Sequence, residues 1–232
     1  MYFQHSGEIW RDFPDLVPGV IFASGITADV PVPPRTDELT AVAASRLAGA
    51  TESELPEIQA WRRAFARMGL KPTQYRCASE SLLRRFRKEG ALPRLHPLVD
   101  LCNAASIAYA IPVAVLDVAR VSGGLEVRYA AGDEKYLTFS GEMEHPAAGE
   151  VIFADEAGQA HARRWTNRQS GLSAVQDSTT DVLIVAEALH ATAATDVPEL
   201  MAAIAAELDS VWSAPPACTV LSPAAPRFPF GP

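Results

Sequence analysis

The chain has 232 residues, enough for one large domain or two small ones with a sizeable core. Hydrophobic residues make up 48% of the sequence and charged residues 21%, which is typical of a globular protein and excludes a disordered, collagen-like or disulfide-framework chain. The longest apolar run, residues 182–194, is interrupted by Glu187 and His190 and is shorter than the roughly 20 residues of a membrane-spanning helix. The formal net charge of −8 argues at first against a polyanionic partner.

The three cysteines form no CxxC pair, and none lies at zinc-finger spacing from a histidine. We therefore expect a reducing compartment and no structural metal. Residues 1–6 resemble the remnant of a cleavable purification tag and are set apart from the fold. No signal-peptide core follows them, so the predicted location is the cytoplasm.

The first half of the chain predicts one buried strand and then four helices. Residues 17–23 form a short apolar run beside proline and glycine, which suits a strand. Apolar spacing and terminal glycines predict the four helices. The first has Thr36 as its N-cap and ends near residue 49, and the others cover residues 54–68, 82–89 and 98–110.

After Pro112, short apolar segments alternate with turn residues, a pattern typical of strands. Strands are predicted over residues 113–116, 125–130, 135–139, 150–154, 159–165 and 181–186. The best hairpin candidate crosses residues 155–158, where a glycine supplies positive φ. A helix is predicted over residues 198–212, and the proline-rich residues 215–232 form an extended tail that can add an edge strand at 219–221.

This order of elements predicts a single α+β domain over residues 7–214. Its helical N-terminal half would pack on a mixed, mostly antiparallel sheet.

The charge is unevenly distributed along the chain. Residues 61–94 hold ten basic and two acidic side chains, a net charge of +8, and the remainder carries −16. Such a segment suits a phosphate backbone, or it is the solvated side of two amphipathic helices paired with acidic residues elsewhere. The candidate RNA-binding residues are Arg62, Arg63, Arg84, Arg85, Arg87 and Lys88.

An ordered series of short motifs runs between about residues 60 and 190. It consists of VDLCNAAS at 99–106, PVAVLD at 112–117, GLEVR at 124–128, GEVIFAD at 149–155 and RRWTNRQS at 163–170. The series resembles the B3/B4 domain, the editing module in the β subunit of bacterial phenylalanyl-tRNA synthetase, which also occurs as free-standing proteins. The resemblance implies an α+β editing domain that acts in trans on the acceptor end of a mischarged tRNA, hydrolysing its ester without cofactor or metal and without DNA as a partner.

Three positions depart from the synthetase-embedded copies of this domain. Ala114 stands where those copies have a histidine, Arg168 where they have a glutamate, and Gln169 where they have a second histidine. Because these groups are proposed to orient substrate or water, we do not expect the embedded domain's amino-acid specificity to carry over.

Two groups of polar residues are the candidate site. Asn103 and Ser106 would share a helix face with Asp100, and their amide and hydroxyl could hydrogen-bond the ester or the terminal ribose, or be satisfied structural groups. The predicted catalytic residues are Asn103, Ser106, Asn167 and Arg168, and the predicted substrate-binding residues are Trp165, Gln169, Ser170 and His161. Trp165 could stack on the terminal adenine, or it could be a core residue between helix and sheet.

The chemistry does not require a Ser-His-Asp arrangement. An aminoacyl ester is activated by its own ammonium group, so an oriented water and hydrogen-bond donors for the oxyanion can suffice. The sequence leaves three functions open: a trans-acting aminoacyl-tRNA deacylase, a tRNA-binding or regulatory module without catalysis, and a pocket for a free amino acid or related metabolite. Ala114 and Arg168 motivate the second of these.

Overall fold

The computed structural model describes residues 1–231. The helices are α1 (Gly7–Asp12), α2 (Arg35–Gly49), α3 (Pro56–Arg67), α4 (Ala78–Glu89), α5 (Pro97–Tyr109) and α6 (Ala193–Trp212), with the 3-10 turns η1 (Glu52–Glu54) and η2 (Val118–Arg120). The strands are β1 (Tyr2–His5), β2 (Val17–Ser24), β3 (Val113–Asp117), β4 (Gly124–Tyr129), β5 (Tyr136–Leu137), β6 (Met143–Glu144), β7 (Val151–Asp155), β8 (Ala160–Arg163), β9 (Arg168–Gln169), β10 (Asp181–Ala188), β11 (Ala217–Val220) and β12 (Arg227–Pro229).

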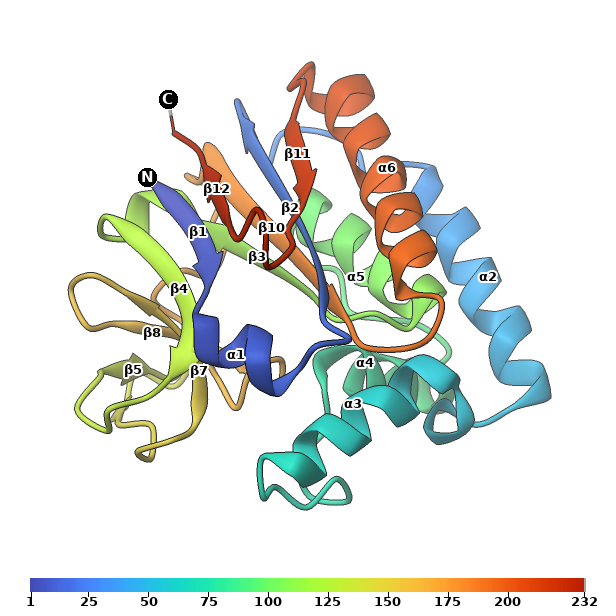
Figure 1. The fold of residues 1–232 in the computed structure, drawn as a ribbon. Coiled ribbons are helices and arrows are strands. Elements are labelled where there is room, and N and C mark those ends of the chain that lie inside the picture. The colour runs from blue at the N-terminus through green and yellow to red at the C-terminus, as the bar shows by residue number, and fades with distance from the viewer. Residues whose placement is uncertain (232) are drawn as a thin grey trace.

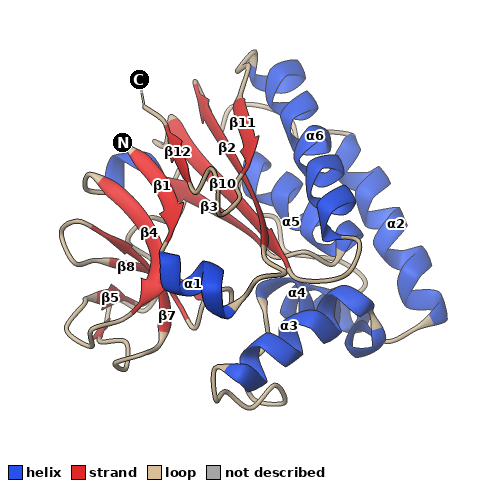
Figure 2. Ribbon diagram, viewed as in Figure 1, coloured by secondary structure: helices blue, strands red, loops and turns tan. Residues whose placement is uncertain are grey.

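The strands form two larger sheets and a short ribbon (Figure 2). The six-stranded sheet has the order β12-β1-β4-β7-β8-β9, in which only β1 and β4 are parallel. The four-stranded sheet, β11-β2-β10-β3, is antiparallel throughout, and β5 pairs with β6. The α+β class and the mostly antiparallel pairing are confirmed, but the strands expected in one sheet are divided between two.

The four-stranded sheet separates two hydrophobic cores. In Figure 1, α2, α5 and α6 lie on one side of this sheet, and β1 and β4 of the six-stranded sheet lie on the other. Side chains alternate across a strand, so Leu183 and Val185 of β10 face the core shared with the six-stranded sheet, α1, α3 and α4. Val182 and Ile184 face the opposite core, which α2, α5 and α6 cover. The near-continuous apolar run of β10 follows from burial on both faces.

The N-terminal residues belong to the fold, so setting residues 1–6 apart from the domain was wrong. β1 lies between β12 and β4, and Phe3 is completely buried. His5 lies within 2.6 Å of the buried carboxylate of Glu187, measured from Nε2 to Oε1. A segment with two ladder partners and a buried charged contact is a structural strand.

The C-terminal tail is also paired, so the domain extends beyond residue 214. β11 pairs with β2 and so forms an edge of the four-stranded sheet. It begins two residues before the edge strand expected at residues 219–221 and ends one residue before it. β12 pairs with β1 on the other sheet. The tail therefore connects the edges of both sheets.

Most predicted helices are confirmed, with different starts. α2 begins at Arg35 after Pro34, so Thr36 lies inside the helix and is not its N-cap. α6 begins at Ala193 and continues through Pro198, which the sequence had placed at its start. The hairpin of β7 and β8 is confirmed, with Gly158 at φ 75° in its turn. No helix within residues 1–231 is long and apolar enough to cross a membrane.

Candidate functional site

A hollow of about 330 Å³ lies beside β3, and we call it the β3 cleft. Its size falls in the range of about 300–1,000 Å³ that is common for small-molecule sites. Its apolar wall includes Val99, Val113 and Val115. Leu95 and Phe139 also line it, and they are 68% and 73% exposed, so the cleft has an apolar rim open to solvent.

His96 lines the β3 cleft, and one of its ring nitrogens has no hydrogen-bond partner. It caps α5, and its Nδ1 accepts a hydrogen bond of 3.2 Å from the backbone N–H of Leu98. Nδ1 is therefore unprotonated, and the proton of the neutral ring is on Nε2. Nε2 is buried and makes no hydrogen bond within residues 1–231. Burial lowers the pKa of His96, against the opposing charges of Asp177 and Asp100, which favours the neutral ring at pH 7.

Asn103 and Asp177 supply two further free polar groups. Asn103 is half-buried on α5, lines the β3 cleft, and makes no side-chain hydrogen bond with the rest of the described chain. Asp177 is exposed at the same cleft, and its carboxylate has no hydrogen bond or ion pair within residues 1–231. The cleft thus combines two donor side chains, an apolar wall and an unpaired carboxylate.

A second, smaller pocket of about 60 Å³ adjoins the cleft, and we call it the inner pocket. Ala114, Arg168 and Gln169, the three positions that depart from the embedded editing domains, all line it. Gln169 and Val113 line both hollows, so the two are neighbours. The inner pocket alone is too small for an amino-acid-sized ligand.

A strained turn after β8 carries residues of the inner pocket. Arg164 and Trp165 adopt positive φ values of 47° and 58°, which are unfavourable for residues other than glycine. Three hydrogen bonds of 2.7 Å hold the turn: Trp165 N–H to the Val151 carbonyl, Ala78 N–H to the Thr166 carbonyl, and Asn167 Nδ2 to the Arg76 carbonyl. Asn167 therefore fastens the turn to the start of α4, and one of the two N–H donors of its amide is already used.

Trp165 is a core side chain. It is completely buried, its ring lies 5.0 Å from that of Trp61 in an edge-to-face arrangement, and its Nε1 donates to Glu187 Oε1 at 2.9 Å. No face of this ring is available to a base, so the structure favours the core role over stacking on adenine. Glu187, which the sequence analysis did not select, is the buried acceptor that Trp165 and His5 share. The sequence feature that could have identified Glu187 is its position as an isolated acidic residue within the longest apolar run.

Three other candidates are completely buried and line neither hollow. Ser106 donates to the Ile111 carbonyl at 2.7 Å and so closes the end of α5. Ser170 donates to the Leu137 carbonyl at 2.9 Å. His161 contacts Ser173 through Nδ1 at 2.8 Å and Asp155 through Nε2 at 3.2 Å. The structure does not bring these side chains to the cleft.

Of the two remaining candidates, Gln169 lines both hollows and Arg168 lines the inner pocket alone. Gln169 donates through Nε2 to the Val115 carbonyl at 2.7 Å. Arg168 is exposed, lies 3.3 Å from Glu144, and has its guanidinium over the Tyr136 ring. The guanidinium of Arg168 is therefore exposed to solvent but already paired with a carboxylate.

Many of the arginines in the basic segment have carboxylate partners. Arg62 and Arg76 contact the buried Glu80, and Arg84 and Arg87 contact Glu52. Arg85 pairs with Glu89, and Arg94 lies within 4.0 Å of Asp37 and Asp100. Within the described residues, Arg63, Arg67, Lys71 and Lys88 form no ion pair. The alternative in which these cations are paired with acidic side chains therefore holds for six of the ten. Their carboxylate partners offset part of the positive charge that the sequence segment carries.

Arg63 and Arg67 are one turn apart on the exposed side of α3. Both line a hollow of about 160 Å³ between α3 and residues 13–15. Arg67 also lies over the Phe13 ring at 5.2 Å. We call Arg63 and Arg67 the α3 pair.

The model of the B3/4 domain matches residues 60–197, which include α4, α5 and the walls of both hollows. The chain belongs to the B3/4 domain family. The family resemblance expected from the sequence is therefore confirmed.

Two curated proteins match parts of this chain. The phenylalanine-tRNA ligase beta subunit of Cereibacter sphaeroides is 34% identical over 73 residues, which cover 32% of this chain and 9% of that protein. The corresponding subunit of Nocardia farcinica is 35% identical over 106 residues, 45% of this chain and 12% of that protein. Each match thus spans about a tenth of the curated relative. A solved N-terminal fragment of the phenylalanyl-tRNA synthetase beta subunit from Pyrococcus horikoshii covers 95% of this chain and 54% of that chain, with 7% identity and a TM-score of 0.46.

Proposed function

We propose that this B3/4 domain hydrolyses the ester bond between an amino acid and a mischarged tRNA, as a trans-acting deacylase in the cytoplasm. The observation that carries the proposal is the β3 cleft, which is lined by His96 and Asn103, both with unpartnered side-chain donors, and by Asp177 with a free carboxylate. The names of the matched relatives, which are tRNA ligase subunits, support tRNA as the partner.

The groups of the β3 cleft match those of an aminoacyl ester. The apolar wall formed by Val99, Val113 and Val115 suits an apolar amino-acid side chain. Asp177 would hold the α-ammonium group by a charge-assisted hydrogen bond. His96 Nε2–H and the Asn103 amide would then donate to the ester carbonyl oxygen.

The same donors would stabilise the transition state. Water adds to the ester carbon, and the negative charge that develops on the carbonyl oxygen is held by His96 and Asn103. Collapse of the intermediate breaks the bond to the ribose oxygen, which takes up a proton with help from the vicinal hydroxyl. The products are the free amino acid and the uncharged tRNA.

The α3 pair would contact the tRNA backbone. Arg63 and Arg67 are exposed and have no carboxylate partner within residues 1–231, whereas Arg84 and Arg87 share Glu52. Unpaired cations release counterions from nucleic acid when they bind phosphate, which makes the affinity depend on salt.

The test is release of radiolabelled amino acid from a panel of misacylated tRNAs. We expect wild-type protein to accelerate release for at least one tRNA charged with an apolar amino acid, and Asn103→Ala to slow it by about 10²–10³-fold. Ser106→Ala is the matched control on the same helix: it removes the bond to the Ile111 carbonyl, which weakens the fold but leaves the cleft donors in place. No release above buffer for any tRNA would refute the proposal.

A second candidate function is tRNA binding without turnover. It is favoured by Ala114, which offers no hydrogen-bonding side chain to the inner pocket, and by Gln169, which already gives one of its two amide N–H donors to the Val115 carbonyl. This function predicts salt-sensitive binding of tRNA with no release of the amino acid.

A further inference from the structure

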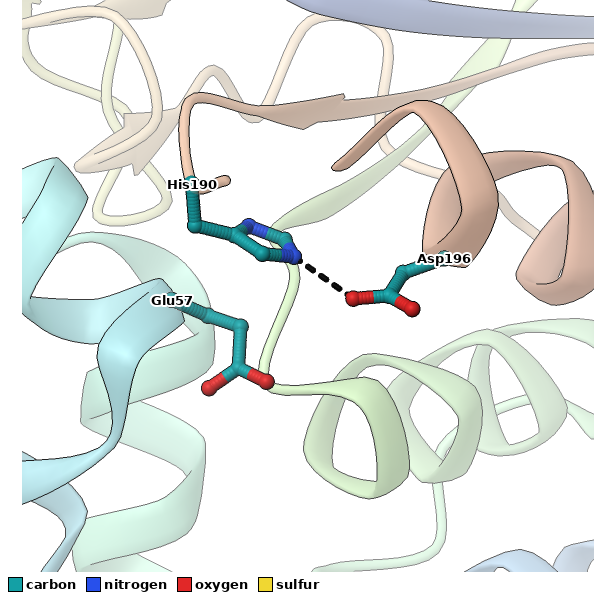
Figure 3. Close-up of side chains that lie close together, drawn as sticks. All are labelled: Glu57, His190 and Asp196. Atoms are coloured by element: carbon teal, nitrogen blue, oxygen red, sulfur yellow. Dashed lines mark hydrogen bonds and ion pairs between the residues drawn. The ribbon is translucent and has the colours of Figure 1, made fainter. Parts of the chain in front are cut away.

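Three side chains outside both hollows converge where α3, the end of β10 and the start of α6 meet. Glu57 lies in the first turn of α3, His190 follows β10, and Asp196 lies in the first turn of α6. One ligand atom of each lies within 4.8 Å of the other two. Figure 3 shows the Glu57 carboxylate beside the imidazole of His190, with Asp196 on the other side of the ring.

The carboxylate of Glu57 is not fully satisfied by the protein. Glu57 is 8% exposed, and its Oε1 accepts a bond of 2.7 Å from Arg46. Its Oε2 is buried and has no hydrogen-bond partner within residues 1–231. A buried carboxylate oxygen without a partner is costly, so Glu57 Oε2 calls for a further hydrogen-bond donor or a cation.

We propose that Glu57, His190 and Asp196 bind one divalent transition-metal ion, with Zn²⁺ as its probe. One imidazole nitrogen with two carboxylate oxygens is a donor set that zinc accepts, at ligand distances of about 2.0–2.2 Å. A bound ion would satisfy the free oxygen of Glu57. It would also replace the proton in the 2.7 Å contact between His190 Nε2 and Asp196 Oδ2, and these atoms would have to separate by roughly 0.6 Å to reach the spacing of two ligands on one tetrahedral ion.

The groups around the three ligands hold the carboxylates in place. Thr192 Oγ1 donates to Asp196 Oδ2 at 2.6 Å, and Arg46 fixes Glu57 while also donating to the Ala108 carbonyl at 2.9 Å. Such outer contacts commonly orient metal ligands. Because the three ligands come from three separate elements, the ion would fasten α3 to α6 as a structural clasp. The cysteine and histidine spacing could not show this site, since Glu57 is remote in sequence from His190.

The test uses the full chain, treated with a chelator and desalted, and titrated with Zn²⁺ by calorimetry. We expect one ion per chain, and a rise in Tm of about 5–10 °C at a zinc concentration 100 times the Kd. Glu57→Gln and His190→Gln should each weaken zinc affinity at least about tenfold, whereas His145→Gln, at an exposed histidine elsewhere, should not.

Two results would overturn the proposal: no zinc binding by wild-type protein, or binding by both variants as tight as that of wild type. Nitrogen NMR of the histidine rings in wild-type protein gives a readout that does not depend on variants folding, because zinc must shift the His190 resonance and leave His145 unchanged. No tRNA is used, so these outcomes are independent of those of the deacylation assay.

Discussion

At His96, a hydrogen bond from the backbone decides which ring nitrogen carries the proton. The N–H of Leu98 occupies Nδ1, so Nε2 is the ring nitrogen left without a partner, on a residue that lines the β3 cleft. His161 has both ring nitrogens occupied by Ser173 and Asp155, although the sequence had favoured it over His96. A histidine is recognised as a candidate donor by its free nitrogen, which sequence does not show.

Glu134 gives a residue-scale prediction about pH. Burial alone would raise its pKa, but the backbone N–H groups of Ala131 and Gly132 and the guanidinium of Arg128 lower the pKa from 4.5 to about 2. The ionised form is therefore favoured in the folded chain, and its contribution to stability is present above about pH 4.5 and is lost as the pH falls toward 2.

We expect Glu134→Gln to lower the free energy of unfolding at pH 7 by about 2–3 kcal/mol. In urea unfolding followed by circular dichroism, the difference from wild type should shrink between pH 4.5 and pH 2. Glu142→Gln, at an exposed carboxylate of the same region, is the control and should show no such change. A constant difference across this pH range would contradict the assignment.

At the scale of elements, the local sequence pattern was sufficient to predict α3, α4, α5 and the β7–β8 hairpin. Their apolar spacing, capping residues and turn glycine lie within the segments themselves. β1 was missed because its stability comes from β4 and β12, both remote in sequence, and four residues carry too short a pattern. β6, β9 and β12 were missed for the same reason.

The placement of β1 predicts a specific pair of mutational effects. Phe3 is completely buried between the sheets, so Phe3→Ala should lower the free energy of unfolding by about 3–5 kcal/mol. Gln4 lies on the half-exposed face of the same strand, so Gln4→Ala should lower the free energy of unfolding by less than about 1 kcal/mol. Denaturant unfolding measures both, and equal small effects would mean that β1 is dispensable to the fold.

The two basic helices differ in how their charges are paired, which predicts different contributions to tRNA binding. Changing Arg63 and Arg67 together to glutamine should reduce the slope of log affinity against log salt by about 1–2. The matched double change at Arg84 and Arg87 should have a smaller effect, because Glu52 already neutralises part of their charge. Filter binding over a salt series measures the slopes, and equal effects would favour the whole basic segment as the contact.

At the scale of the whole molecule, the site is assembled from segments that are distant in the chain. The start of α5, β3 and the loop after β9 together form the β3 cleft. The sequence motifs identified Asn103 and Gln169, which the structure places there, but not His96 or Asp177, which stand outside the motifs. The motifs also included Ser106, Ser170 and Trp165, whose polar atoms the fold uses internally.

The central claim is that the β3 cleft receives the aminoacyl group. The most direct measurement is a crystal structure with a non-hydrolysable 3′-aminoacylamino-adenosine that carries an apolar amino acid. The expected result is a carbonyl oxygen within hydrogen-bond distance of His96 Nε2 and the Asn103 amide, with the ammonium group beside Asp177. An analogue bound in the inner pocket, or bound only on the outer surface away from β3, would contradict the account.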